Sequence, residues 1–127
     1  MRRQIIASTG AKPQGPYSPA IVASGPTVYI SGQGPVDSNG QLQFGSFREQ
    51  AELTFQNVTA LLQAAGTSWE HVVKVGVFLA DINDFTEMNA IYTTYLTEPY
   101  PARTTVQVVL PGRMAIEVDC IAVIPES

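Results

Sequence analysis

The strongest local signal in this sequence is an amphipathic helix over residues 47–65. Ser46 and Glu49 form the S-x-x-E pattern of a capping box, in which each side chain binds the backbone N–H of the other residue. Apolar residues then recur at spacings of three and four, which places them on one face of the helix: Ala51, Phe55, Val58, Leu62 and Ala65. Gly66 is suited to end the helix. A stripe of this length has to be buried, so the helix needs a second layer to pack against.

The remaining periodic segments supply that layer as β-strands. A second helix is predicted over residues 85–96, opened by Asp84 and ended by the prolines at 99 and 101. Strands are predicted at residues 3–7, 20–23, 27–31, 72–80, 104–110 and 116–124. Turn sequences at 24–26 and 111–112 predict two hairpins, and the segment 72–80, apolar on both faces, should be a central strand. The order β-β-β-α-β-α-β-β therefore predicts an α+β fold with two helices packed on one face of a sheet.

The length and apolar content predict a single domain over residues 1–127 that associates with other copies. Of its 127 residues, 45% are hydrophobic and only 14% are charged. The sheet face away from the helices should carry Val109, Ile121 and Val123 beside Glu117 and Asp119. A partly apolar, uncovered face predicts association through the sheet.

Charge and residue types exclude several functional classes. The net charge is −4 and the seven basic residues are scattered, so the basic stripe needed to bind nucleic acid is absent. One cysteine and one histidine provide no metal-ligand cluster and no disulfide. The start of the sequence lacks a signal-peptide pattern and residues 72–80 are too few to cross a bilayer, so a cytoplasmic location without membrane contact is the default expectation.

Arg103 and Glu117 are the leading candidates for chemistry. Arg103 stands at the mouth of a predicted strand in a chain with few cations, and its planar guanidinium suits a carboxylate. The alternative is a surface arginine paired with a nearby acid. Glu117 lies among β-branched residues and is able to orient a water or carry a proton; the alternative is a solvent-facing position on an edge strand.

A regular hairpin around the turn at 111–112 would place Arg103 and Glu117 roughly 15 Å apart at ~3.3 Å per residue. They would then meet one small substrate only at a site between two subunits. Tyr17 is a rigid loop aromatic that either lines a pocket or anchors the loop in the core. Ser31 precedes glycines whose backbone N–H groups suit an anion. From residue type alone Asn89 is interpreted as a solvated side chain and Cys120 as a small core residue.

Six blocks of sequence occur together in a recognisable order. They are Gly15-Pro-Tyr-Ser18, Ile30-Ser-Gly-Gln33, Ala64-Ala-Gly66, Phe85-Thr-Glu-Met-Asn89, Pro101-Ala-Arg-Thr-Thr-Val106 and Ile116-Glu-Val-Asp-Cys-Ile-Ala122. Together they resemble the reactive intermediate deaminase A family (RidA, also called YjgF), over nearly the whole chain.

The resemblance implies a chorismate-mutase-like fold with a mixed sheet of about six strands, assembled as a homotrimer with sites between subunits. It implies hydrolysis of enamine and imine intermediates, such as 2-aminoacrylate, 2-iminopropanoate and 2-iminobutanoate, to 2-keto acids and ammonia without a cofactor or metal. Such an activity belongs to metabolite damage control. The implied roles are carboxylate binding by Arg103 and the Thr105 backbone, water activation by Glu117, and further site positions at Tyr17, Ser31 and Asn89.

The sequence departs from the family pattern at two places. Thr105 stands where many members carry cysteine, and the loop at 97–101, which should edge the cleft, is shorter than usual. The main alternative function is a non-catalytic trimer of the same fold that binds a ligand or acts as a chaperone. An endoribonuclease is the weakest alternative, because the chain is acidic and has no histidine pair.

Overall fold

The computed structural model describes residues 1–126 and contains the predicted order of elements. The strands are β1 (Arg2–Ile5), β2 (Ala20–Ala23), β3 (Thr27–Gln33), β4 (Val72–Leu79), β5 (Ala102–Gln107) and β6 (Ile116–Val123). The helices are α1 (Phe47–Ala64) and α2 (Phe85–Tyr95), with short 3-10 turns at Trp69–His71, Ile82–Asp84 and Pro111–Arg113. The strand predicted at 3–7 lies one or two residues nearer the amino terminus, and the strand predicted at 104–110 begins two residues earlier and ends three residues earlier.

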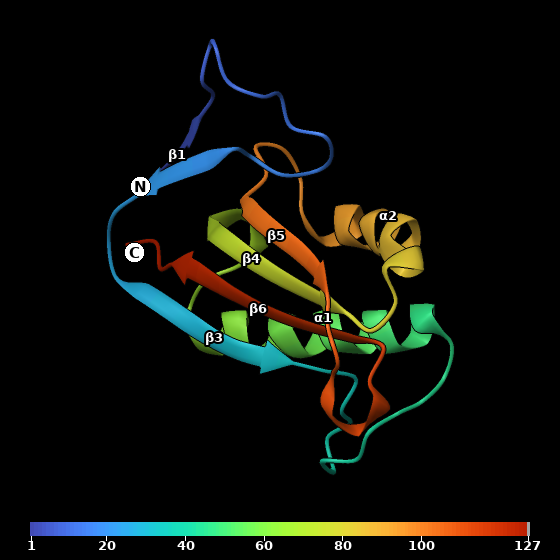
Figure 1. Ribbon diagram of the computed structural model, residues 1–127. Helices are drawn as coiled ribbons and strands as arrows, with labels where there is room; N and C mark the ends of the chain where they lie inside the picture. Colours follow the sequence, from blue (N-terminus) through green and yellow to red (C-terminus); the bar gives the residue numbers. More distant parts are fainter. Residues whose placement is uncertain (127) are drawn as a thin grey trace.

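The strands form two sheets, and neither predicted hairpin exists. A four-stranded mixed sheet has the order β3-β6-β4-β5, and β1 pairs only with β2. The turn at 24–26 therefore carries the chain from one sheet to the other (Figure 1). β4 lies between β5 and β6, parallel to β5 and antiparallel to β6. β4, which has apolar residues on both faces, is an inner strand of the sheet, and it separates the two strands expected to pair with each other.

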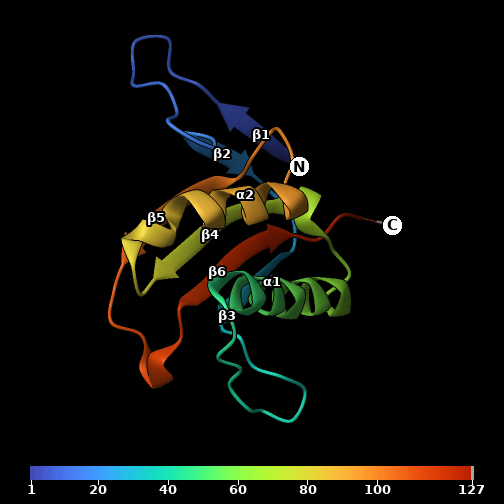
Figure 2. The same ribbon diagram turned by 90° about the vertical axis from the view of Figure 1, so that its right-hand side faces the viewer.

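Both helices lie over the same face of the four-stranded sheet (Figure 2). Alternate strand residues point to this face and are buried beneath α1 and α2, among them Val75, Val77, Val118 and Cys120. The α1 stripe packs on them, with Phe55 and Leu62 fully buried. The core thus arises from the helical and strand periodicities that the sequence displays.

The start of α1 follows the sequence prediction and the start of α2 does not. The Ser46 side chain accepts a hydrogen bond from the Glu49 N–H, and the Glu49 carboxylate accepts one from the Ser46 N–H. At α2, Asp84 makes no side-chain capping bond. Asp81 instead accepts from the Asn83 N–H and caps the 3-10 turn that leads into the helix. The 3-10 turn runs directly into α2, so the capping aspartate is Asp81, three residues before the predicted Asp84.

The sheet face away from the helices is open and partly apolar. Tyr29 on this face is 75% exposed, and Val109, just beyond β5, is fully exposed. Val123 is expected on this open face from the sequence but is buried. It lines a pocket together with Met1, Arg2 and His71. The apolar side chains of the open face are therefore Tyr29, Val106 and the half-buried Phe78 and Ile121, with Val109 just beyond its edge. Within residues 1–126, no helix is long and apolar enough to cross a membrane.

Cys120 is the small core residue that the sequence predicted. Burial, with a further contribution from Asp119, raises the pKa of its thiol to about 12. Because the thiolate is the reactive form, we expect iodoacetamide at about pH 8 to leave Cys120 unmodified in the native protein and to alkylate it in urea. Mass spectrometry of the intact chain measures this difference. Rapid alkylation of the native protein would contradict the buried, neutral thiol.

Candidate active site

Arg103 lies at the edge of the sheet, beneath α2. In the β4–β5 ladder it pairs with Val75, so both side chains point to the helical face. Its guanidinium carbon is 4.8 Å from the ring centroid of Tyr92 and 5.7 Å from that of Phe85, both on α2. Its Nη1 donates a 2.8 Å hydrogen bond to the Oδ1 of Asn89. Aromatic rings and one amide thus fix the guanidinium in place.

Within residues 1–126, the charge of Arg103 has no acidic partner. Among residues 1–126, the ion pairs are Arg48 with Glu87 and His71 with Glu70. The interpretation of Arg103 as a surface arginine paired with an acid is therefore wrong for the described chain. Burial lowers the pKa of Arg103, an effect that Tyr92 and Tyr17 oppose. A half-buried cation with unused donors is suited to bind an anion.

The neighbouring Tyr92 does not supply that negative charge. Its hydroxyl is fully buried, and burial raises the pKa of this group, which keeps it neutral. The hydroxyl has no hydrogen-bond partner within the described residues. Asn89, interpreted from its residue type as a solvated side chain, is half-buried and binds the guanidinium directly, because it lies four residues after Phe85 on the same face of α2.

A small cavity of about 220 Å³ opens beside the guanidinium and is lined by Tyr17, Phe85, Arg103 and Thr105. Tyr17 is half-buried, its ring centroid is 5.9 Å from the guanidinium carbon, and its hydroxyl accepts from the Gln14 N–H. It therefore lines a pocket rather than anchoring the loop in the main core. Phe85 was missed by sequence reasoning; its position one helical turn before Asn89 was the available signal.

The backbone at Thr105 offers a second donor to this cavity. β5 is an edge strand, and the N–H of Val108 donates to Leu79 on β4. On the other side of the strand, the Pro101 carbonyl accepts from Ser18. Successive residues of a strand direct their backbone groups to opposite sides, so Thr105 shares the side of Pro101 and not that of Val108. The N–H of Thr105 therefore points away from β4, to the open edge of the sheet.

Glu117 and Ser31 lie on the other side of the sheet. Glu117 alternates with the buried residues Ile116 and Val118, so its side chain points to the open face. A Cβ on Gly32 would stand 2.7 Å from the Glu117 carboxyl carbon, so the carboxylate occupies the space that this glycine leaves. Ser31 is exposed at the adjoining β3 irregularity. β6 lies between β3 and β4, so the alternative that Glu117 lies on an edge strand is wrong.

The predicted site residues therefore form two half-sites on opposite faces. The first contains Tyr17, Asn89, Arg103 and Thr105, and the second contains Ser31 and Glu117. Arg103 and Glu117 are two strands and three register positions apart. At ~4.8 Å per strand and ~3.3 Å per residue, their backbones are roughly 14 Å apart. This separation agrees with the one predicted from the sequence, although the hairpin assumed in that prediction does not form. One subunit therefore does not bring the two side chains together.

No three His, Cys, Asp or Glu side chains within residues 1–126 converge on a possible metal position. The first half-site is suited to anion binding, by the Arg103 guanidinium and the backbone N–H of Thr105. The chemistry available in the second half-site is hydrogen bonding and proton transfer by a carboxylate.

Comparison with known proteins identifies the family. The family model described as "Endoribonuclease L-PSP" matches residues 8–124, so the chain belongs to this family, the RidA/YjgF family that the sequence blocks resemble. The chain is 42% identical over 125 residues to the 2-iminobutanoate/2-iminopropanoate deaminase of Homo sapiens, covering 97% of this chain and 90% of the relative.

Solved structures share the fold. The crystal structure of RidA from an Antarctic Psychrobacter is 41% identical, with a TM-score of 0.73 and coverage of 96% of this chain and 99% of that chain. A structure titled as a putative endoribonuclease from Thermotoga maritima is 38% identical, with a TM-score of 0.75 and coverage of 99% and 100%. The fold is therefore the chorismate-mutase-like α+β fold of this family, with two helices on a mixed sheet.

Proposed function

We propose that this protein, a single domain over residues 1–127, is a deaminase that hydrolyses small 2-imino acids to 2-keto acids and ammonia. The observation that carries the proposal is Arg103, a half-buried cation that lines a small aromatic cavity and has no acid partner in the part of the chain that the structure describes. The name of the human relative, 2-iminobutanoate/2-iminopropanoate deaminase, supports the same chemistry.

The first half-site would hold the substrate by its carboxylate. A guanidinium binds a carboxylate through two parallel hydrogen bonds. The hydrogen bond from Nη1 to Asn89 fixes the orientation of the Arg103 guanidinium before the substrate binds. The N–H of Thr105 would bind the same carboxylate. The rings of Tyr17 and Phe85 leave about 220 Å³, which favours short apolar side chains next to the carboxylate.

The second half-site would come from a neighbouring subunit. Because the half-sites lie on different surfaces, the interface that joins them is heterologous, with the open face of one subunit against the Arg103 edge of the next. Heterologous contacts close into a ring when the rotation allows it. The family resemblance implies a ring of three, so we propose a homotrimer with one site at each interface.

The reaction then needs only a positioned water and one proton carrier. The iminium carbon is already electrophilic, so no cofactor is required. Glu117 would accept a proton from the water molecule while the water oxygen bonds to the iminium carbon, which gives a carbinolamine. Return of that proton to the nitrogen lets the C–N bond break, and deprotonation of the hydroxyl gives the 2-keto acid and ammonium. General acid–base help of ~10²–10⁴-fold is adequate for a reaction that also proceeds in water.

A trapping assay tests the proposal. An amino-acid oxidase generates the imine, and semicarbazide captures whatever escapes hydrolysis. We expect the wild-type protein to suppress semicarbazone formation, and Arg103→Ala to lose this effect. Arg113→Ala is the matched control, because Arg113 is exposed and contacts the Phe44 ring away from the cavity.

Unchanged trapping with wild-type protein for every small substrate would overturn the deaminase proposal and favour a non-catalytic, ligand-binding trimer. The endoribonuclease activity in the titles of some relatives has less support here, because the basic residues are scattered and the net charge is −4. RNA cleavage that depends on Arg103 would reverse that preference.

A further inference from the structure

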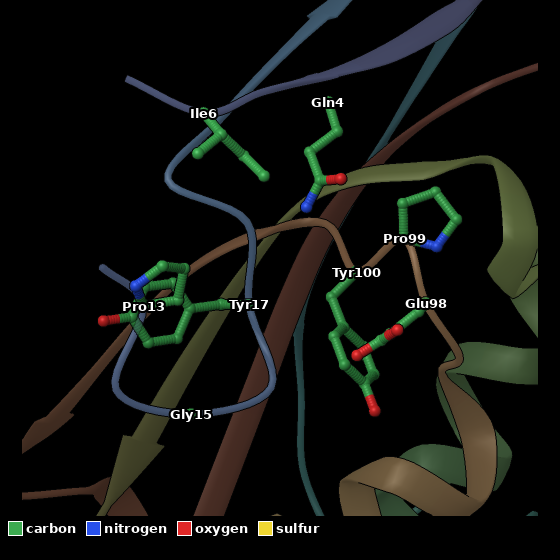
Figure 3. A pocket seen from close by; sticks show the side chains of 8 residues that line it. All are labelled: Gln4, Ile6, Pro13, Gly15, Tyr17, Glu98, Pro99 and Tyr100. Carbon is green, nitrogen blue, oxygen red and sulfur yellow. The ribbon is translucent and has the colours of Figure 1, made fainter. Parts of the chain in front are cut away.

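A second and larger depression lies beside the Arg103 cavity. Its volume is about 680 Å³, and it lies between the amino-terminal loop and the segment that precedes β5 (Figure 3). Its walls are formed by eight residues: Gln4, Ile6, Pro13, Gly15, Tyr17, Glu98, Pro99 and Tyr100.

The depression adjoins the site where the carboxylate would bind. Tyr17 lines both cavities. A Cβ on Gly15 would lie 4.0 Å from Nη2 of Arg103, so the bare backbone of Gly15 borders both the guanidinium and the depression. A substrate held by Arg103 therefore has room to extend a long side chain past Gly15 and Tyr17.

Two side chains that line the depression, Gln4 and Glu98, offer acceptor oxygens. Among residues 1–126, Glu98 takes part in no ion pair. Figure 3 shows its carboxylate and the amide of Gln4 directed into the cavity. The Nε2 of Gln4 donates to the Ser18 hydroxyl, which leaves its Oε1 as an acceptor. None of the eight described residues that line the depression is a lysine, arginine or histidine, although Arg2 donates to the carbonyl of Pro99, which is one of them. The Tyr100 ring adds a surface that attracts cations.

We propose, on the basis of the deaminase function above, that this depression is a subsite for 2-imino acids whose long side chain ends in a cation. The α-carboxylate would bind Arg103 at one end, and Glu98 would bind an ammonium or guanidinium at the other. Glu98 is then the residue that determines specificity for charge, and its effect is modest because its carboxylate is exposed to solvent.

A pair of substrates with matched shapes tests this subsite. The imines generated from L-arginine and L-citrulline have side chains of equal length, but only the first carries a charge. We expect wild-type kcat/KM to favour the arginine-derived imine by about two- to fivefold at low salt, the range typical of an exposed ion pair. Glu98→Gln should bring the ratio close to one, and high salt should do the same. Glu70→Gln, which changes an acid outside the depression, should leave the wild-type ratio intact.

The imine from 2-aminobutanoate separates the two proposals. If wild-type protein hydrolyses this short imine but shows no preference between the long ones, the subsite is wrong and the deaminase function stands. A preference that Glu98→Gln leaves unchanged also overturns the role of Glu98. If wild-type protein hydrolyses none of the three imines, the deaminase function fails and the subsite fails with it.

Discussion

Two inactive variants, Arg103→Ala and Glu117→Gln, should restore each other's activity when they assemble together. Alone, Arg103→Ala should lose at least about 10²-fold in kcat/KM, because it removes the charged partner of the carboxylate. Glu117→Gln should lose about 10²–10⁴-fold, because the amide does not accept the proton. In a mixed ring, about a quarter of the sites receive an intact Arg103 from one subunit and an intact Glu117 from its neighbour. Co-expression with two affinity tags and the trapping assay measure the recovery.

The double variant in one chain is the control for this experiment. Mixed in equal amounts with wild-type subunits, it should leave about a quarter of the sites intact if each site spans two subunits, and about half if each subunit holds its own site. No recovery in the mixture of single variants, with about half in the control, would place the whole site within one subunit. That outcome would contradict the assignment of Arg103 and Glu117 to opposite faces of the sheet.

Phe55→Ala should produce the largest loss of stability of any single truncation in the core, about 3–5 kcal/mol. Phe55 is fully buried, and its ring stacks on Tyr95 with centroids 5.0 Å apart. It also contacts Trp69 at 5.8 Å and Tyr92 at 6.1 Å. The substitution would leave a cavity where α1, α2 and the turn before β4 meet. Urea unfolding followed by Trp69 fluorescence, at one fixed protein concentration, measures the change.

The same substitution at an exposed phenylalanine is the control. Phe44 is 53% exposed, so Phe44→Ala should change the free energy of unfolding by no more than about 0.5 kcal/mol. Because Tyr92 lies between Phe55 and the guanidinium of Arg103, Phe55→Ala should also raise KM for the imine. A loss of stability below about 1 kcal/mol would mean that the aromatic cluster repacks around the missing ring. The position of the Arg103 guanidinium would then not depend on Phe55.

Parts of the candidate site could be read from the sequence because they depend on residue type. Arg103 stood out as one of few cations, and the blocks around Tyr17, Ser31 and Glu117 resembled a known family. The environment of each residue was not readable. Residue type alone predicts a solvated Asn89 and does not mark Phe85 and Tyr92 as neighbours of Arg103, because a contact with Arg103 depends on how α2 lies across β5. That packing brings together residues distant in the chain.

The sequence alone determined the helices, the positions of the strands and the apolar faces that form the core. These features follow from local signals: the capping box at Ser46, the stripe through Phe55 and the alternation in β6. Only the tertiary structure decided which strands pair. β4 separates the segments expected to form a hairpin and places Val75, Val77 and Leu79 in the core beneath the helices. Contacts between residues far apart in the chain decide this pairing, so a turn sequence between neighbouring strands does not predict it. That pairing in turn sends Arg103 and Glu117 to opposite faces, so the strand order sets where any site between subunits would form.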